Sequence, residues 1–249
     1  MNSIHPKNNN SPFNETYFQR ATYADVSFKK YSQYWWSNRF YAGLAKKFGP
    51  QSGNVLEVGA GLGHLLGWFE ADRYKVYGTD INPWALEQAS KNVPGANFSL
   101  TDAEALTSFA DSYFQIVVSK HVVEHLPNPE KGVSELCRVL APGGLLLLAT
   151  PNLDSPMRTW KKSQWIGYRD PTHISLKPPS AWINQLKKNN LTIKKKFSDG
   201  FWDAPYLPWI PKTIQKLFFG APGGLQAIMG WSIIPVCMGE SLIILASKP

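Results

Sequence analysis

Short apolar runs alternate with segments of helical periodicity through the middle of the chain. The apolar runs include NVLEV, KVYGT, FQIVVS and GLLLLAT, and the helical segments among them are HLLGWFEADR, PWALEQASKN and PEKGVSELCRVL. A strand followed by a helix, repeated several times, is typical of a parallel sheet with helices on both faces. The pattern therefore predicts an α/β fold.

Several element boundaries can be read from turn and capping residues. Asn82-Pro83 and Asn128-Pro129 each place a capping residue before a proline at the first helical position, so each predicts a helix start. Near the end, LTIKKKFSDG and GESLIILASK read as two strands. They are separated by an insertion, 201–238, that is rich in Pro, Trp and Gly.

The N-terminal region divides into two parts. Residues 1–12 are polar and lack the basic-then-apolar pattern of a signal peptide, so we expect a disordered tail and a cytoplasmic protein. Residues 13–50 carry many aromatic side chains among polar ones, which predicts amphipathic helices that end at Gly49-Pro50. We expect these helices to cap a main domain over 51–249, with 201–238 as a second cap.

The composition fits one large domain of 249 residues, and Cys137 and Cys237 form no CxxC pair, so we expect them to be small core residues without zinc. The formal charge of +8 is unevenly placed, because residues 155–216 hold 12 Lys and Arg but 3 Asp and Glu. This basic region fits a solvated face, an anionic substrate, an anionic membrane surface or nucleic acid. The uncharged stretch 217–239 contains Pro and Gly that argue against a spanning helix.

A glycine loop follows the first apolar run. In VLEVGAGLGHLLGWF, Gly59, Gly61 and Gly63 stand between a strand and a helix, where the backbone can approach a ligand. The NAD fingerprint needs a further glycine where this chain has His64. Glu57 disfavours a pyrophosphate in the loop and suits a cationic ligand. The loop therefore indicates a positively charged ligand in place of a dinucleotide.

Taken together, VLEVGAGLG, GTDIN, TDAEAL, FQIVVSKHVVEHLPNP and RVLAPGGLLLLATPN resemble the class I S-adenosylmethionine-dependent methyltransferases of small-molecule type. The resemblance spans about Val55 to Asn152. It implies a Rossmann-like, doubly wound, seven-stranded sheet with an antiparallel last strand, and S-adenosylmethionine as the co-substrate.

The resemblance also implies a set of donor-binding residues. The glycine loop would lie under the methionine part, the acid after the second strand would hold the ribose, the pair after the third strand would meet the adenine, and the end of the fourth strand would face the methyl group. These positions are Glu57, Gly59, Ala60, Gly61, Gly63, Asp80, Ile81, Asp102, Ala103, Ser119, Lys120 and His121. Asp102 could equally cap a helix beginning at AEAL.

Two segments contain candidate catalytic histidines. HVVEHL places His121, Glu124 and His125 on one predicted helical face, and they could bond the next loop, act as a base or hold a metal. The run resembles a metal element of ubiquinone-biosynthesis O-methyltransferases, except that His121 stands in place of a carboxylate, so we expect no metal. In RDPTHISLKPPSAWINQL, Asp170 could orient His173 for proton removal, or His173 could bond backbone carbonyls.

These observations favour methyl transfer to an oxygen, or less readily a nitrogen, of a small acceptor that is partly apolar, such as a lipid-linked or aromatic molecule. An RNA methyltransferase or nucleic-acid-binding module is the alternative, because Trp160, Trp165 and Tyr168 lie among basic residues and could stack on bases. A dehydrogenase and a donor-binding protein without turnover also stay open. The 201–238 insertion is expected to roof the acceptor site, to rest on an anionic bilayer as a peripheral contact, or to be a structural cap. The acceptor's identity and the oligomeric state are left open.

Overall fold

The computed structural model describes residues 13, 15–17, 26–70 and 72–249. The predicted tail 1–12, and residues 14 and 18–25 of the predicted N-terminal helical cap, lie outside the described residues.

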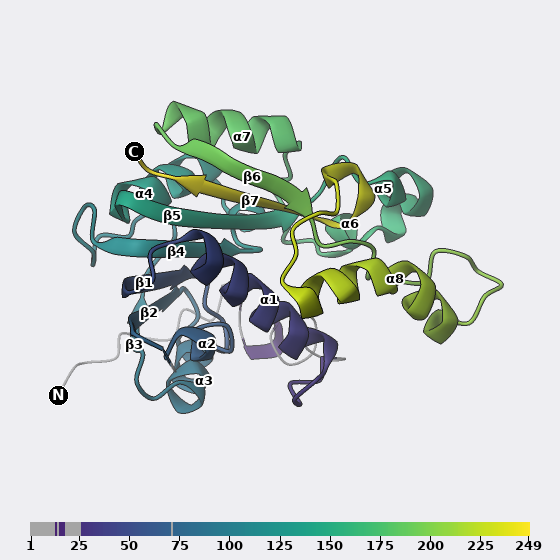
Figure 1. The fold of residues 1–249 in the computed structure, drawn as a ribbon, viewed down its shortest axis with the longest axis horizontal. Helices are drawn as coiled ribbons and strands as arrows, with labels where there is room; N and C mark the ends of the chain where they lie inside the picture. The colour runs from purple at the N-terminus through teal and green to yellow at the C-terminus, as the bar shows by residue number, and fades with distance from the viewer. Residues whose placement is uncertain (1–12, 14, 18–25, 71) are drawn as a thin grey trace.

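A seven-stranded sheet forms the centre of the molecule, in the order β3-β2-β1-β4-β5-β7-β6 (Figure 1). The first five strands are parallel, and β7 runs antiparallel between β5 and β6. This confirms the predicted doubly wound sheet with an antiparallel last strand. The strands are β1 Gly53–Val58, β2 Tyr74–Asp80, β3 Asn97–Leu100, β4 Phe114–Lys120, β5 Leu140–Pro151, β6 Thr192–Ser198 and β7 Ser241–Ser247.

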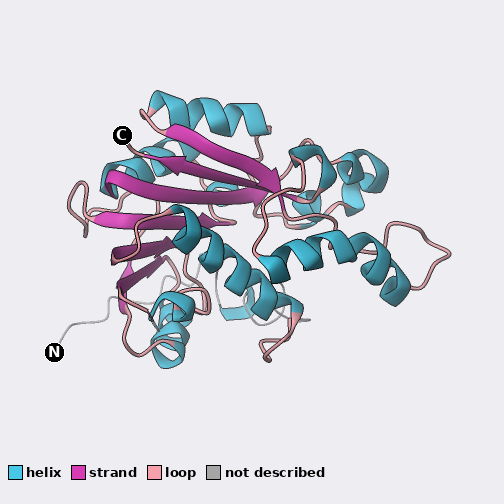
Figure 2. Cartoon of the chain, in the orientation of Figure 1, coloured by secondary structure: helices cyan, strands magenta, loops and turns pink. Residues whose placement is uncertain are grey.

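Helices cover both faces of this sheet (Figure 2). One apolar core forms between the sheet and α1 and α2, and a second forms between the sheet and α4 and α7. The α-helices are α1 Gln33–Phe48, α2 Gly67–Glu70, α3 Pro83–Asn92, α4 Pro129–Val139, α5 Pro156–Lys161, α6 Ile166–Arg169, α7 Pro179–Lys188 and α8 Lys212–Met229. The 3₁₀ turns within the described residues are η2 Val123–His125, η3 Lys162–Gln164 and η4 Val236–Met238.

The predicted helix boundaries are confirmed, with two local differences. Asn82 caps α3 through Oδ1, which accepts from the N–H groups of Trp84 and Ala85 at 2.8 and 3.1 Å. Asn128 precedes α4 but makes no capping hydrogen bond; its Nδ2 donates to Oε2 of Glu104 at 3.1 Å. The helix predicted over HLLGWFEADR is reduced to α2, since the N–H of Phe69 bonds the carbonyl of Leu66 in a 3₁₀ pattern.

The insertion before the last strand contains α8, which packs against α1 and projects beyond the carboxyl ends of the parallel strands (Figure 1). Within it, Cys237 is exposed, whereas Cys137 is buried. The prediction that both cysteines are core residues is therefore wrong for Cys237, which lies in η4 on the outer side of the insertion. None of the described helices combines the length and apolar character needed to span a bilayer.

Candidate active site

The glycine loop turns sharply between β1 and α2. Gly59, Gly61 and Gly63 have φ angles of 71°, 52° and 77°, a region that favours glycine. A Cβ atom at Gly59 would lie 2.3 Å from Cγ2 of Val122, so a side chain at this position would strain the approach of the loop to the end of β4. The N–H of Ala60 bonds the carbonyl of Thr79 at 2.8 Å, which fixes the loop against β2.

Asp80 links the glycine loop to the end of β2. Its Oδ2 accepts from the N–H of Gly61 at 2.9 Å, and its Oδ1 accepts from the N–H of Asn82 at 2.9 Å. Burial raises the pKa of Asp80, while these backbone hydrogen bonds lower it. A carboxylate has further lone pairs, so Asp80 can still accept from a ligand hydroxyl. Ile81 beside it is 43% exposed.

At the end of β3, Asp102 closes a turn. Its Oδ1 accepts from the N–H of Glu104 at 2.8 Å, and Asp102 itself is exposed. No helix follows, so the alternative in which Asp102 caps a helix over AEAL is wrong, although the side chain does cap a turn. Ala103 is buried behind it.

Glu57 and Lys120 lie near the ends of β1 and β4 and influence each other's charge; Glu57 is buried, and Lys120 is half-buried. Burial raises the pKa of Glu57 to about 8, with Lys120 lowering it and Asp80 raising it. Burial lowers the pKa of Lys120 to about 8, against the opposing effect of Glu57 and Asp199. Oε2 of Glu57 and Oγ of Ser119 have no hydrogen-bond partner among the described residues. Two buried acceptors are therefore available next to the glycine loop.

Several polar residues around Lys120 were not predicted. Its Nζ donates to Oδ1 of Asn38 at 3.0 Å and lies 4.8 Å from the ring centroid of Tyr41. Asp199, after β6, is half-buried, and loss of hydration raises its pKa; it accepts from the N–H of Ser241 at 3.0 Å. The helical spacing of Asn38 and Tyr41, which places both on the inward face of α1, could have indicated these two residues from the sequence. No sequence motif marks Asp199.

The segment after β4 departs from the predicted helical face. Only the 3₁₀ turn η2 forms, because His121 has φ of 55° and lies outside helical geometry. Nevertheless His121 Nδ1 lies 3.1 Å from Oε1 of Glu124. Burial raises the pKa of Glu124, but the hydrogen bond and charge of His121 outweigh this and lower it. Glu124 is fully buried, and its Oε2 has no partner among the described residues.

His125 bonds the loop before α7, as one of its predicted alternatives required. Its Nδ1 lies 2.9 Å from Oγ1 of Thr172 and 3.2 Å from the carbonyl of Thr172. Oγ1 of Thr172 donates to Oδ1 of Asp170 at 2.5 Å, so it accepts the Nδ1 proton of His125. In this tautomer Nε2 of His125 carries a lone pair. Burial lowers the pKa of His125, so the neutral base persists at lower pH.

His173 lies beside His125, but Asp170 does not hydrogen-bond it. Nε2 of His173 is 3.9 Å from Oδ2 of Asp170, which instead accepts from the hydroxyl of Tyr17 at 3.0 Å. Nδ1 of His173 lies 2.8 Å from the carbonyl of Gly167. The structure therefore bears out the alternative in which His173 satisfies a backbone carbonyl. The orienting hydrogen bond expected from Asp170 is absent, because Thr172 and Tyr17 occupy its oxygens.

The described residues bring together one set of groups suited to a cation. One ligand atom from each of Glu124, His125 and His173 lies within 4.8 Å of the others. This set differs from the predicted trio, because His173 takes the place of His121. One carboxylate and two imidazoles could hold a divalent metal.

The N-terminal segment lies across these groups. The ring of Phe13 meets that of His125 edge-on, with centroids 5.3 Å apart. The carbonyl of Phe13 accepts a hydrogen bond from the side chain of Asn82. Phe13 therefore spans from the end of β2 to the histidine after β4. The predicted N-terminal cap contacts the candidate site at this point.

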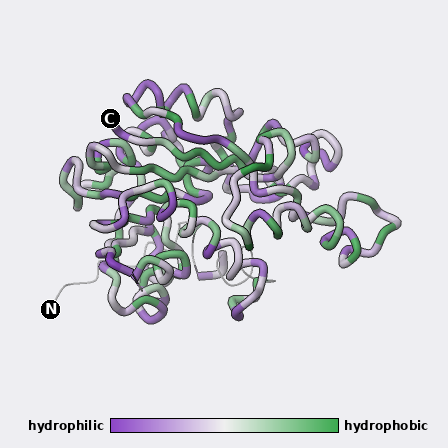
Figure 3. The backbone as a smooth tube through the Cα atoms, in the orientation of Figure 1, coloured by the Kyte–Doolittle hydropathy of each residue, from purple (hydrophilic) through white to green (hydrophobic). Residues whose placement is uncertain are grey.

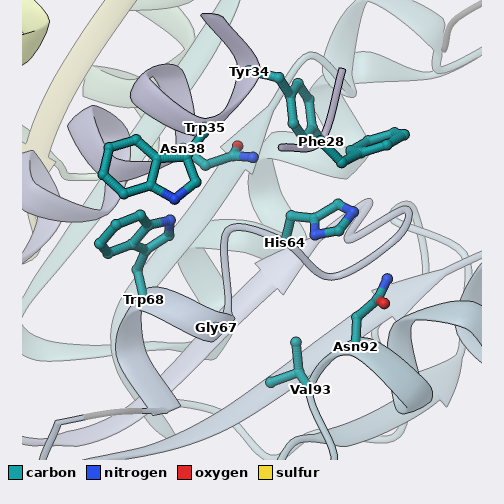
Figure 4. A pocket seen from close by; sticks show the side chains of 9 residues that line it. All are labelled: Phe28, Tyr34, Trp35, Asn38, His64, Gly67, Trp68, Asn92 and Val93. Atoms are coloured by element: carbon teal, nitrogen blue, oxygen red, sulfur yellow. The ribbon is translucent and has the colours of Figure 1, made fainter. Parts of the chain in front are cut away.

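An aromatic pocket of about 220 Å³ lies beside the end of the glycine loop, where His64 lines it (Figure 4). His64 follows the loop and stacks on Phe28, with ring centroids 4.7 Å apart, and burial lowers its pKa. Tyr34, Trp35 and Trp68 also line the pocket. Sequence reasoning missed it because the aromatic residues come from separate segments.

The aromatic residues expected to stack on nucleic acid are divided by the fold. Trp165 is fully buried, and its Nε1 donates to Oε2 of Glu240 at 2.6 Å. Trp165 therefore cannot stack on bases, which corrects that part of the nucleic-acid alternative. Trp160 and Tyr168 remain exposed.

A family model described as a methyltransferase domain matches residues 28–196. The chain is 29% identical over 192 residues to the 2-methyl-6-phytyl-1,4-hydroquinone methyltransferase of Synechocystis sp., covering 71% of this chain and 58% of that protein. It is 31% identical over 116 residues to the ubiquinone biosynthesis O-methyltransferase of Azoarcus sp., covering 45% of this chain and 47% of that protein. The chain thus spans less than two thirds of the length of these curated relatives. A crystal structure titled as a putative methyltransferase from Bacillus halodurans shares the fold, with a TM-score of 0.60 and 23% identity over 84% of this chain and 98% of that chain.

Proposed function

Since this chain belongs to the methyltransferase domain family, we propose that it transfers the methyl group of S-adenosylmethionine to an oxygen of a small, partly apolar acceptor. The observation that carries the proposal is the buried carboxylate of Glu57, whose Oε2 has no partner among the described residues. An acceptor in this position attracts a cationic ligand and repels a pyrophosphate. S-adenosylmethionine carries a sulfonium and an ammonium group.

The donor's methionine part fits the charges around the glycine loop. In the proposed complex, Glu57 accepts from the ammonium group, and Lys120 faces the carboxylate. The part of the donor that joins its ammonium and carboxylate groups lies over the glycine loop, at Gly59, Ala60, Gly61 and Gly63. Asp80 accepts from the ribose hydroxyls with the lone pairs that Gly61 and Asn82 leave free. Ile81, Asp102 and Ala103 border the adenine, and Ser119 and His121 border the methyl group.

Methyl transfer from a sulfonium is an in-line displacement, so the protein mainly aligns the acceptor and excludes water. The acceptor oxygen forms a bond to the methyl carbon as the bond from carbon to sulfur breaks, leaving S-adenosylhomocysteine. Nε2 of His125 takes the hydroxyl proton, because the contact of Nδ1 with Thr172 fixes the required tautomer. His173 stands as the second candidate base. No metal step is needed for this chemistry.

Contacts of the candidate base support an acceptor with apolar character. The ring of Phe13 lies against His125, so an acceptor that reaches this histidine meets an aromatic side chain. The relatives named for hydroquinone and ubiquinone biosynthesis support a phenol or quinol, while an amine is the less favoured acceptor. RNA is disfavoured, because Trp165 is buried and Asp203 pairs with both Lys161 and Arg169.

The test is to incubate the protein with methyl-labelled S-adenosylmethionine and a panel of phenols, hydroquinones, amines and RNA. We expect labelled product in the organic extract of a phenolic acceptor. A His125→Asn variant provides the control for base-dependent transfer. Label in RNA alone, or label in amines with normal rates in the variant, would contradict the proposal.

A further inference from the structure

The amphipathic helix α8 packs on the rest of the molecule by a polar side and exposes an apolar side. Its buried residues are two glutamines, Gln215 and Gln226, whereas most of its large apolar residues face solvent. The exception is Phe219, which is half-buried with its ring against Tyr206. In a helix that packs on a core by its apolar stripe, the reverse orientation is expected. The exposed side of α8 therefore needs a partner that the described residues of the chain do not supply.

The exposed residues form one continuous stripe. At about 100° per residue they fall within an arc of roughly 120° around the helix. The stripe consists of Ile214, Leu217, Phe218, Leu225, Ile228 and Met229, and is called the α8 stripe below. Leu217 and Phe218 are 68% and 72% exposed. Trp209 before the helix is 74% exposed, and Trp231 after it is also exposed.

The two inward glutamines show that this orientation is built into the helix. Gln215 accepts from the N–H groups of Tyr206 and Leu207 and donates to the carbonyl of Ile210 at 2.6 Å. Gln226 accepts from the N–H groups of Ile233 and Ile234 and donates to the carbonyl of Ser198 at 2.8 Å. Turning the stripe inward would break both sets of buried hydrogen bonds, so the stripe stays outside.

Positive charge lies at both ends of α8, and no carboxylate is nearby in sequence. Residues 204–239 contain no Asp or Glu, and Lys212 and Lys216 are exposed on the first turns of α8. At the other end, Arg39 and Lys47 of α1 donate to the carbonyls of Ile228 and Gly230. Figure 3 shows hydrophobic positions along the projecting loop and helix. The combination fits an anionic lipid surface.

We propose that α8 docks on an anionic bilayer, with the α8 stripe in the interfacial region and Trp209 and Trp231 at its two ends. A second copy of the chain is a poorer partner, because it would bring the same cations to the interface. A lid closed over an acceptor is also a poorer explanation, because the stripe faces solvent. Docking extends beyond the proposed function and does not depend on it.

The experiment is co-sedimentation of the full chain with phosphatidylcholine vesicles, with and without phosphatidylglycerol. We expect binding to the anionic vesicles that weakens with salt. L217Q/F218Q should reduce the partition coefficient about tenfold or more, because two large apolar side chains no longer enter the interface. L100Q is the matched control, since Leu100 is 55% exposed but lies on β3, outside the stripe. K212Q/K216Q should weaken anionic binding more than K131Q.

Thermal melting curves establish that the variants are folded, and a helix held by Gln215 and Gln226 should survive changes to its outer face. Sedimentation velocity without lipid separates docking from self-association. A dimer that dissociates in L217Q/F218Q, with equal vesicle binding by parent and variant, would overturn the proposal. So would a monomer that binds neither type of vesicle.

Discussion

The ring centroids of His125 and His173 lie 4.6 Å apart, although one residue follows β4 and the other precedes α7. The Nδ1 atom of each ring lies against a carbonyl oxygen of the 167–172 segment. Burial lowers the pKa of His125, and the neighbouring His173 lowers it further. The neutral form of His125 is therefore favoured at the candidate site.

His125→Ala should lower kcat about 10²- to 10⁴-fold with little change in donor affinity, because it removes the base. In the parent protein, activity should rise with pH through a pKa below the ordinary 6.5, since the neutral form of His125 is the active one. His173→Ala should shift this increase in activity to higher pH, because it removes a positive charge that lowers the pKa of His125. Rate profiles from pH 5 upward measure both. If both variants had the same kinetics as the parent protein, neither histidine would act as the base. Alignment of the donor with the acceptor would then account for the whole rate.

Asp80→Asn should weaken the binding of S-adenosylhomocysteine by about tenfold or more, because hydrogen bonds to a charged acceptor contribute about 1.5–3 kcal/mol. Calorimetric titration measures the affinity, and the increase in melting temperature on adding ligand gives a second measure. Asp111→Asn is the matched control, because Asp111 is an exposed partner of Arg138 away from the loop. Stabilisation of the parent protein by NAD and not by S-adenosylhomocysteine would refute the donor assignment.

Glu57→Gln should remove the increase of donor affinity with pH. Burial raises the pKa of Glu57 to about 8, so its carboxylate forms only as the pH rises toward that value. Affinity for S-adenosylhomocysteine in the parent protein should therefore increase between pH 6 and 8. In the variant this increase should be absent, because the remaining group, Lys120, has a pKa of about 8 and loses positive charge as the pH rises. The free energy of unfolding without ligand depends on pH in the opposite direction. The protonated form of Glu57 stabilises the fold, and this stability is lost as the pH rises through the raised pKa of Glu57. Glu87→Gln on the surface of α3 should retain the parent profile.

Activity should survive treatment with EDTA, because methyl transfer with a histidine base requires no metal. The geometry makes this a sharp test, since Glu124, His125 and His173 lie close enough to hold a divalent ion. The measurement is the initial rate before and after chelation. Loss of activity that returns with added Mn²⁺ or Zn²⁺ would assign these three residues to a metal.

Trp165→Phe should destabilise the protein by about 1–3 kcal/mol, because it takes a buried N–H donor from Glu240. Trp165→Ala should cost more, about 3–5 kcal/mol, since it also leaves a cavity. Urea unfolding followed by circular dichroism gives both values. Trp160→Phe is the control, because Trp160 is 59% exposed and its loss should cost less.

The sequence was sufficient to predict the sheet, the glycine loop and the starts of α3 and α4, because periodicity and capping are local properties. The sequence was insufficient where the role of a side chain depends on a partner far away along the chain. The sequence left open whether Asp170 orients His173 or His173 bonds a backbone carbonyl. Tyr17 and Thr172 occupy Asp170, and the carbonyl of Gly167 meets His173. Trp165 was placed with stacking residues, although Glu240 holds it in the interior. The donor and catalytic residues stay predictions.

Composition likewise indicated an apolar cap in 201–238, but not the direction in which its apolar residues face. A hydrophobic pattern shows that a helix has two faces, but it does not state which face meets the core. In α8 this is decided by Gln215 and Gln226, two residues that composition treats as ordinary surface side chains.

In most surface helices one set of side chains both folds the helix and determines what the helix touches. The inward glutamines of α8 separate these roles. They hydrogen-bond the helix to its neighbouring loops, so the outer positions are not needed to hold the helix in place. Substitutions in the outer positions could then accumulate over generations without unfolding the enzyme. The membrane docking proposed for α8 can thus evolve independently of the residues of the candidate active site.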